Sequence, residues 1–298
     1  MSSWNGKSKG GVLGYKIFIA LLKHLPLSWV YLVLHFVSFY YFIFTNKSGI
    51  KYYFRQRLNY PILKTYRCIN KNFYIFGQTL LDKIAVLSGI TNRFTFEMDG
   101  EQYLREAVAN RQGGILVGAH MGNWEIAGQF LTRLEAPINI VMFDGEQNNI
   151  KDLLEQVMVK KSVHIILMRE NDDSHLYEIH RALQNKELIA FHGDRYLSDS
   201  RNITCQFLGA PAKFPAGPFY LAIHYQVPVF FVNAMKDTPT HYHFYSTPGR
   251  IYPKPGNKKE RDHQLKKMVS DYVAELERIL MKYPLQWFNY HHFWCSNQ

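Results

Sequence analysis

An apolar run at residues 114–119 ends at His120 and is followed, after a turn at Gly122, by a helix-like pattern at 126–134. A short apolar run that stops at a turn before a helix is typical of a buried strand in a sheet covered by helices. The end of this strand places an imidazole beside the first turn of a helix, where Glu125 stands. Because a carboxylate can orient an imidazole and stabilise its protonated form, His120 and Glu125 are the first candidate catalytic pair.

The same alternation continues along the second part of the chain. Expected strands lie at 114–119, 138–143, 163–167, 188–192 and 227–233, and helical patterns lie at 101–110, 124–134, 149–159, 174–184, 218–224 and 259–282. Strands that alternate with helices favour βαβ units and a largely parallel or mixed sheet flanked by helices. We therefore expect an α/β domain at 93–298, preceded by a membrane-associated helical segment at 1–92.

The N-terminal segment contains an uncharged stretch, 24–46, that is about long enough to cross a bilayer as a helix. Aromatic residues crowd its second half, and His35 and Ser38 lie inside it, so a helix lying in the membrane interface fits as well. A buried core helix is the third interpretation. Residues 61–89 continue as an amphipathic helix or hairpin that could rest on lipid or pack on the α/β part.

The formal net charge of +11 comes from the N-terminal segment. Of the 35 Lys and Arg residues 13 lie before residue 94, whereas Asp82 is the single acidic residue there. The rest of the chain is nearly neutral, which argues against a nucleic-acid surface on the α/β part. Basic residues around an apolar stretch suit an anionic membrane surface. The three cysteines and the paired histidines show no metal-ligand spacing, so no metal is expected.

Four blocks of the sequence resemble, in the same order, those of the bacterial lipid A biosynthesis late acyltransferases, a family of the lysophospholipid-acyltransferase-like superfamily. The second block is the His-x-x-x-x-Glu motif at 120–125. The others are Trp4-x-Gly6-x-Ser8-x-Gly10; Phe191-His192-Gly193-Asp194-Arg195, followed by Phe207-Leu208-Gly209 and by 213–218; and Tyr283-Pro284-x-Gln286-Trp287-Phe288. Together these blocks extend over most of the chain.

The resemblance implies an acyltransferase that moves a fatty acyl chain from acyl carrier protein or acyl-CoA to a hydroxyl or amine of a membrane lipid, first of all a lipid A precursor. It implies that His120 is the general base, that Glu125 holds the other ring nitrogen, and that no cofactor is used besides the acyl donor. It also implies the bacterial inner membrane, with the catalytic domain on the cytoplasmic side. No motif identifies the acceptor or the chain length, and an aminolipid, a glycolipid or a polyene acceptor remains open.

Six residues are candidates for substrate binding: Asn123, Asp194, Arg195, Lys213, Phe214 and Gly217. The planar guanidinium of Arg195 suits a phosphate of the lipid or of the donor, and Asp194 and Arg195 could equally form an ion pair at the end of a strand. Residues 214–217 predict a tight turn that opens a helix, a natural anion site beside Lys213. Either Arg195 or the backbone N–H groups of Gly122 and Asn123 could stabilise an oxyanion.

Two other classes of protein compete with this interpretation. A serine hydrolase needs a Gly-x-Ser-x-Gly turn between a strand and a helix, and the match at 6–10 lies in the basic N-terminus with no strand before it. A non-catalytic lipid-binding relative would need neither member of the pair, so the presence of both His120 and Glu125 favours an enzyme.

Overall fold

The structure is a computed structural model, and it describes residues 12–87, 89–90, 93–123, 126, 134, 136–143, 163–169, 172–196 and 200–295. The N-terminal helices are α1 Val12–His24, α2 Leu27–Phe44, α3 Ser48–Tyr52, the π-helix η1 Tyr53–Arg57 and α4 Ile62–Leu87. The later helices are α5 Glu101–Ala109, α8 Ser174–Gln184, α9 Gly217–Tyr225 and α10 Lys258–Lys282. The strands are β1 Thr95–Asp99, β2 Gly114–Gly118, β3 Ile138–Phe143, β4 Val163–Met168, β5 Leu188–His192, β6 Asn202–Phe207, β7 Ala210–Pro215, β8 Val229–Thr238 and β9 His241–Ser246.

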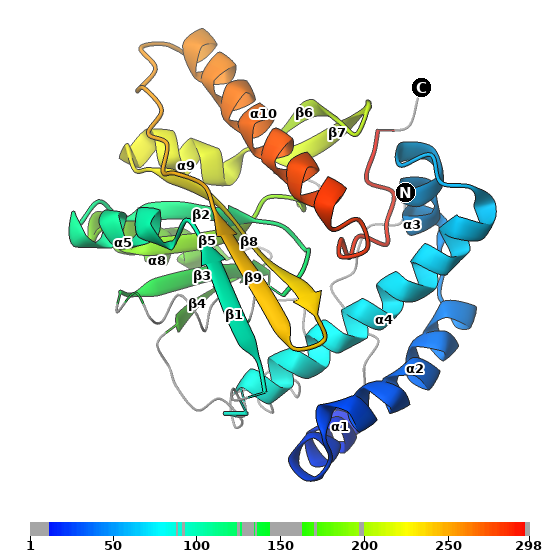
Figure 1. Cartoon of the computed structure of the whole chain (residues 1–298). Helices are drawn as coiled ribbons and strands as arrows, with labels where there is room; N and C mark the ends of the chain where they lie inside the picture. Colours follow the sequence, from blue (N-terminus) through cyan, green and yellow to red (C-terminus); the bar gives the residue numbers. More distant parts are fainter. Residues whose placement is uncertain are drawn as a thin grey trace.

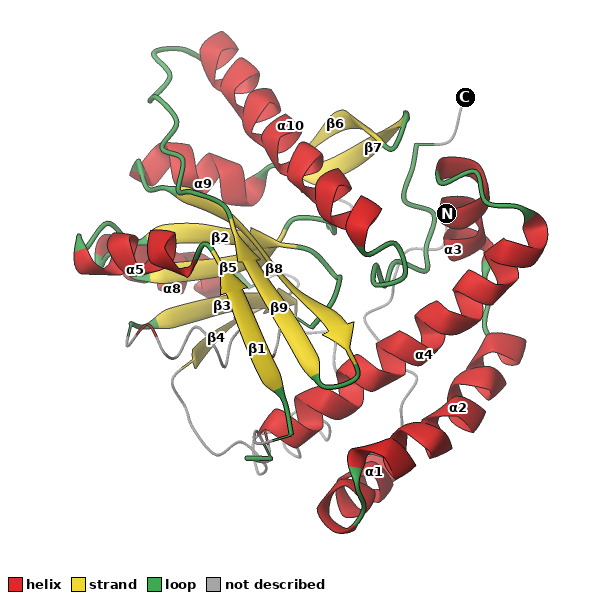
Figure 2. Cartoon of the chain, in the orientation of Figure 1, coloured by secondary structure: helices red, strands yellow, loops and turns green. Residues whose placement is uncertain are grey.

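A seven-stranded sheet in the order β1-β9-β8-β2-β5-β3-β4 forms the centre of the described structure. Neighbouring strands run parallel except for the β8–β9 hairpin, and β1 pairs with β9 in parallel. Helices α9 and α10 lie near the β2 and β8 part of the sheet, and the N-terminal helices pass the other end of the β8–β9 hairpin (Figures 1 and 2). The predicted α/β class with a parallel-dominated sheet is confirmed.

The five expected strands are present as β2, β3, β4, β5 and β8. Three features escaped sequence analysis: β1, β9 and the antiparallel hairpin of β6 and β7. Strand β1 alternates exposed and half-buried residues, so it contains no apolar run to detect. Leu208 and Gly209, both at positive φ, form the turn of the β6–β7 hairpin, as two-residue hairpin turns require. The expected helices at 124–134 and 149–159 lie almost wholly outside the described residues.

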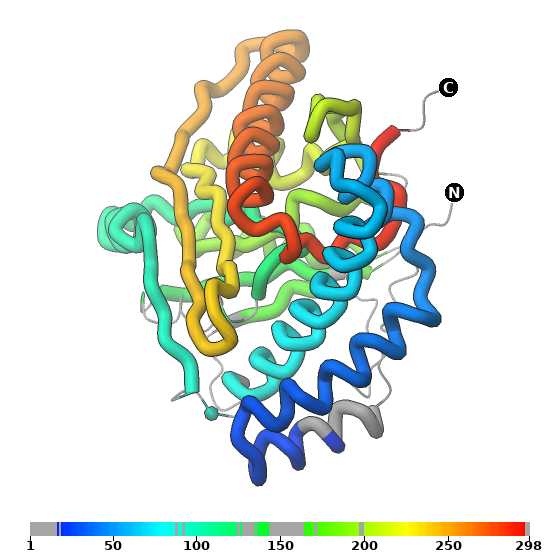
Figure 3. The backbone as a smooth tube through the Cα atoms, turned by 45° about the vertical axis from the view of Figure 1, so that its right-hand side comes forward, coloured from blue at the N-terminus to red at the C-terminus, as the bar shows by residue number. Residues whose placement is uncertain are grey.

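The N-terminal helices α2 and α4 lie side by side along much of their length (Figure 3). Helix α2 buries one face, with Val30, Tyr31 and Leu34, and exposes large apolar residues such as Phe36 and Phe39 on the other. Among the described residues, one helix, α2, is long enough and apolar enough to cross a membrane. Helix α2 therefore has one face buried against α4 and an opposite apolar face that is exposed.

A continuous core joins the N-terminal helices to the α/β part. Ile50, Tyr53 and Ile69 belong to the same buried cluster as Val117 of β2 and Tyr272 of α10. Around the aromatic tail, five buried rings contact one another: Tyr53, Phe207, Trp287, Phe293 and Trp294. Burial of so many large rings contributes several kcal/mol, at roughly 25 cal/mol per Å² of apolar area removed from water. The helices before residue 93 are therefore packed on the sheet, whatever else they contact.

Candidate active site

The register of β2 and β5 brings His120 and Asp194 together. Gly118 pairs with His192 in this parallel ladder, so the residues two positions further on leave the sheet at neighbouring points. The ring Nδ1 of His120 lies 2.7 Å from Oδ1 of Asp194, and the backbone N–H of His120 also donates to this carboxylate, with N···O distances of 3.0 and 3.1 Å. Both groups stand beyond the carboxyl ends of strands, where ligands of open α/β sheets bind.

Gly122 makes the turn after His120 possible. Its φ is +60°, and a Cβ at this position would lie 2.0 Å from the carbonyl oxygen of Ala234. The backbone N–H of Asn123 donates to that same oxygen at 2.7 Å, so the turn rests directly on β8. A side chain at position 122 would push the turn away from β8, and a glycine is therefore required there.

The C-terminal block at 283–288 is fastened across the same turn. The N–H of Phe288 donates to the carbonyl of His120 at 2.9 Å, and the N–H of Gly122 donates to the carbonyl of Gln286 at 3.0 Å. Between them, the indole N–H of Trp287 donates to Oδ2 of Asp194 at 3.1 Å. Three of the sequence blocks, at 120–125, 191–195 and 283–288, thus meet at one point.

The electrostatics of the site keep Asp194 ionised. Burial by itself would raise the pKa of this carboxyl, but the charge and hydrogen bond of His120 and the charge of Arg195 hold the pKa well below its usual range. The side chain is 1% exposed, whereas that of His120 is 23% exposed. A buried carboxylate thus faces an imidazole that solvent can reach.

Two further histidines surround the pair. The ring of His192 lies 4.0 Å from that of His120, centroid to centroid, and burial together with the charge of His120 lowers the pKa of His192 well below its usual range. Burial and the charge of Arg195 lower the pKa of His291 to about 4. Both rings are therefore neutral at pH 7, so they add no positive charge that would oppose protonation of His120.

The remaining predicted residues lie in different surroundings. The amide of Asn123 is buried, donates to the carbonyl of Thr79 at 2.9 Å, and accepts from the N–H of Ile126 at 3.3 Å, as an N-cap does. Arg195 donates to the carbonyl of Phe288 at 3.4 Å. Glu125 lies outside the described residues.

The expected tight turn at 214–217 differs from the structure. Phe214 belongs to strand β7, and its ring is fully buried against Phe207 and Tyr272, because alternate residues of this strand face the core. Lys213 is exposed, and so is Gly217, where helix α9 begins. The expected helix start is present, but it follows a strand and not a turn at Phe214.

The turn at Gly122 and Asn123 also requires a correction. Sequence analysis named their backbone N–H groups as candidate oxyanion donors, but both already donate to carbonyl oxygens, of Gln286 and Ala234. Of the two candidate oxyanion donors, the Arg195 side chain and these backbone N–H groups, the Arg195 side chain therefore remains. The contact between His120 and Asp194 was missed as well, although the equal distance of both residues from the ends of β2 and β5 is a signal that could have found it.

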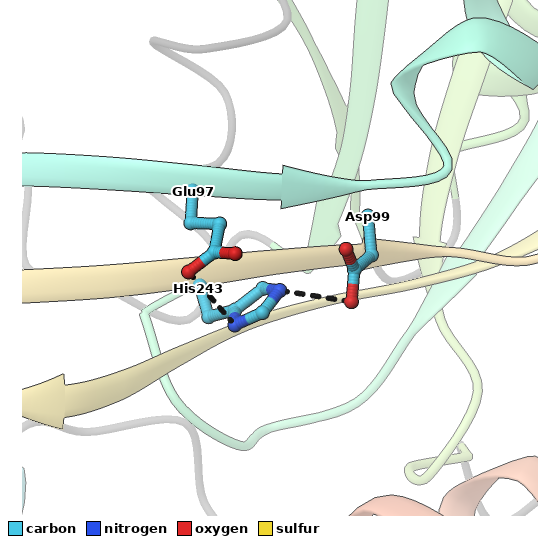
Figure 4. Close-up of side chains that lie close together, drawn as sticks. All are labelled: Glu97, Asp99 and His243. Atoms are coloured by element: carbon cyan, nitrogen blue, oxygen red, sulfur yellow. Dashed lines mark ion pairs between the residues drawn. The ribbon is translucent and has the colours of Figure 1, made fainter.

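One histidine–carboxylate cluster occurs among the described residues away from this site, formed by Glu97, Asp99 and His243 (Figure 4). Glu97 Oε2 lies 3.9 Å from Nδ1 of His243, whereas Asp99 Oδ2 lies 3.0 Å from Nε2. One ligand atom from each of the three residues lies within 4.8 Å of the other two, so the group has the spacing of a possible cation site, and Oδ2 of Asp237 lies 3.5 Å from Nδ1 of the same ring. The same contacts join β1 to β9 as ion pairs whenever the ring is protonated.

The profile of a family described as bacterial lipid A biosynthesis acyltransferase matches residues 9–296. Among curated proteins, no sequence matches. The crystal structure of the 1-acyl-sn-glycerophosphate acyltransferase PlsC from Thermotoga maritima is similar at a TM-score of 0.41 and 11% identity, covering 89% of this chain and 100% of that one.

An α/β sheet with a histidine–carboxylate pair beyond its strand ends defines an α/β enzyme with a candidate general base. The match over nearly the whole length shows that the chain belongs to the bacterial lipid A biosynthesis acyltransferase family. The protein is an acyltransferase, and its family implies an acyl donor and a lipid acceptor in general. Together with the apolar helix α2, this family suggests membrane association.

Proposed function

We propose that the protein transfers a fatty acyl chain from acyl carrier protein or acyl-CoA to a hydroxyl group of a lipid A precursor, with His120 as the general base. The observation that carries the proposal is the 2.7 Å contact between Nδ1 of His120 and the buried carboxylate of Asp194. A carboxylate on Nδ1 orients the ring and stabilises its protonated form, as a base that accepts a hydroxyl proton requires. Membership of the family supports the choice of acceptor.

The chemistry follows from the tautomer that this contact favours. With Nδ1–H donating to Asp194, Nε2 carries the lone pair that accepts the proton. As Nε2 takes the proton of the acceptor hydroxyl, the oxygen attacks the carbonyl carbon of the thioester. The intermediate then breaks its C–S bond, and the sulfur leaves with the proton that Nε2 returns. One ester forms, one thioester is cleaved, and the step balances without a cofactor.

Negative charge develops on the carbonyl oxygen during this step. We assign Arg195 to that charge or to a phosphate of the donor or acceptor, because its guanidinium stands beside the catalytic turn through its bond to Phe288. Lys213 and Gly217 remain candidates for a substrate phosphate at the exposed start of α9. Glu125 remains a candidate for a second acid acting on His120.

We further propose that residues 1–92 attach the enzyme to the bacterial inner membrane, with residues 93–298 as the catalytic domain on the cytoplasmic side. The exposed apolar face of α2 supports contact with lipid. The excess of Lys and Arg before residue 94 supports attraction to an anionic leaflet, at about 1 kcal/mol for each basic residue near the surface.

The proposal is tested by mass spectrometry of lipids from cells that lack the gene and are complemented with wild type, His120→Ala or His263→Ala. His263 is an exposed residue of α10 and serves as the matched control. We expect one lipid to lose an acyl chain on deletion. If wild type and His263→Ala restore that chain and His120→Ala does not, the lipid is the acceptor and the proposed reaction is supported. If the lost chain belongs to an aminolipid, a glycolipid or a polyene, the lipid A acceptor is wrong. If His120→Ala restores the lipid fully, the protein is a non-catalytic lipid-binding relative.

A further inference from the structure

A buried polar network connects the N-terminal helices to the sheet. Asp82 of α4 is fully buried and pairs with Nζ of Lys236 on β8. The hydroxyls of Tyr31 on α2 and Tyr242 on β9 donate to the same carboxylate. Lys236 also donates to the carbonyl of Pro239 at 2.7 Å. A buried ion pair is tolerated when its remaining hydrogen-bonding capacity is used, and here α2, β9 and the carbonyl of Pro239 supply the further partners.

This network reaches the catalytic turn through the side chain of Asn123. The hydroxyl of Tyr242, which donates to Asp82, accepts from Nδ2 of Asn123 at 3.3 Å. The same Nδ2 donates to the carbonyl of Thr79, one helical turn before Asp82 on α4. The side chain of Asn123 is therefore hydrogen-bonded both to α4 and to Tyr242, which is itself hydrogen-bonded to α4. His120 lies three residues earlier in the same turn.

The backbone of Lys236 reaches the catalytic turn by a second route. Its N–H donates to Oε1 of Gln286 at 2.9 Å, and its carbonyl accepts from Nε2 of Gln286 at 2.7 Å. The carbonyl of Gln286 in turn accepts from Gly122. Lys236 thus connects two parts of the protein. Its side chain contacts the N-terminal helices, and its backbone binds Gln286, which in turn binds Gly122.

We propose that Asp82, Lys236, Tyr242 and Tyr31 are positioning residues for the His120 turn, so that helices α2 and α4 belong to the catalytic apparatus and are more than a membrane attachment. The inference rests on the proposed acyl transfer. Its physical reason is that a general base must stay within hydrogen-bond reach of the acceptor hydroxyl, and a displacement of about 1 Å can cost 10²-fold in rate. Asn123 and Gly122 set the position of His120, and both are held by this network.

The test compares conservative variants of full-length protein in an acyl-transfer assay with a fatty acyl thioester of acyl carrier protein as donor and a lipid A precursor as acceptor. Tyr242→Phe and Tyr31→Phe each remove one hydroxyl and keep the ring. Tyr252→Phe is the matched control, because Tyr252 is also buried and donates to a carboxylate, that of Asp271, at 2.8 Å, and among the described residues it makes no hydrogen bond to the His120 turn. For each variant, kcat and KM at saturating co-substrate, the melting temperature and membrane flotation are measured.

We expect Tyr242→Phe to lower kcat by about 10-fold, with KM changed less than about twofold, and Tyr31→Phe to lower kcat by a smaller factor. Tyr252→Phe is expected to keep kcat even where it loses as much thermal stability. Equal kcat values in Tyr242→Phe and Tyr252→Phe overturn the inference, as does a loss of kcat that only follows the folded fraction. An inactive wild type overturns the proposed function instead, which keeps the two failures distinct.

Discussion

The indole N–H of Trp287 donates to Oδ2 of Asp194 at 3.1 Å, while Oδ1 of the same carboxylate faces Nδ1 of His120 at 2.7 Å. Trp287 and Asp194 are 93 residues apart in the chain. The tryptophan thus fixes the carboxylate that, in our proposal, fixes the base. Its fully buried ring, packed on Tyr53 and Phe207, makes this anchor rigid.

Replacement of this tryptophan by phenylalanine should separate its hydrogen bond from its bulk. We expect Trp287→Phe to lower kcat by about 10-fold and stability by about 1–3 kcal/mol, because Oδ2 of Asp194 loses one of its two donors and keeps only the backbone N–H of His120. Trp294→Phe is the control, since Trp294 is buried in the same cluster but donates to the carbonyl of Phe207 at 2.8 Å. Denaturant titrations and initial rates decide: a control that loses kcat equally would contradict the role of Trp287.

Variants of His120 and of the two candidate acids, Asp194 and Glu125, separate their roles. We expect His120→Ala to abolish transfer and Asp194→Asn to lower it by about 10²–10⁴-fold, because the amide can no longer stabilise the protonated ring. Glu125→Ala is expected to lower the rate while membrane binding persists. Transfer rates and flotation on vesicles measure both properties. A wild-type rate in Asp194→Asn would show that the carboxylate beside Nδ1 is not needed.

The neutral His291 should make stability depend on pH. Its folded pKa of about 4 lies below the ordinary value for an unfolded chain, roughly 6.5. Above about pH 6.5 its contribution to stability is complete, and it is lost as the pH falls toward 4, because the unfolded chain then binds a proton that the folded chain does not. His192, whose pKa is lowered too, acts in the same direction.

We therefore expect the urea concentration at the denaturation midpoint to decrease as the pH is lowered from 6.5 to 4, and to decrease less in His291→Asn. Urea titrations at several pH values across this window measure the effect. His263→Asn, at an exposed position of α10, is the control and should follow the wild type. An identical pH dependence in wild type and His291→Asn would contradict the lowered pKa of this half-buried ring.

The outward face of α2 should govern attachment to lipid. Phe36 and Phe39 are 75% and 54% exposed, so a glutamate at either position costs little folding energy but opposes insertion next to anionic lipid. We expect Phe36→Glu/Phe39→Glu to lower partitioning onto anionic vesicles by at least about 10-fold, with the melting temperature nearly unchanged. Tyr177→Glu, at a 71% exposed position on α8, should bind vesicles like wild type. If flotation of the double variant is unchanged, the exposed face of α2 is not the surface that contacts the membrane.

Apolar runs predicted β3, β5, β2 and β8 in the middle of the sheet, because a strand buried on both faces must be apolar throughout, and they also predicted the edge strand β4, which contains an apolar run although it is partly exposed. The edge strand β1, and β9 with its histidines and tyrosines, contain polar residues that face solvent or one another, so no such run marks them. The same limit applies to Asp82. The sequence shows it as a lone acid in a basic segment, but nothing local indicates its pairing with Lys236, 154 residues away.

For the site, the sequence by itself determined the reactive residue types and the turn that holds them. His120 after an apolar strand, Gly122 at a position that excludes a side chain, and the blocks at 191–195 and 283–288 are all legible as ordered residues along the chain. Only the tertiary structure decided which groups meet: the register of β2 with β5 places Asp194 on the ring of His120, and the path of the C-terminal segment places Trp287 on Asp194. The physical reason is that residue types and local turns depend on neighbours in the chain, whereas strand register and the course of a segment across the sheet depend on burying all apolar surfaces at once.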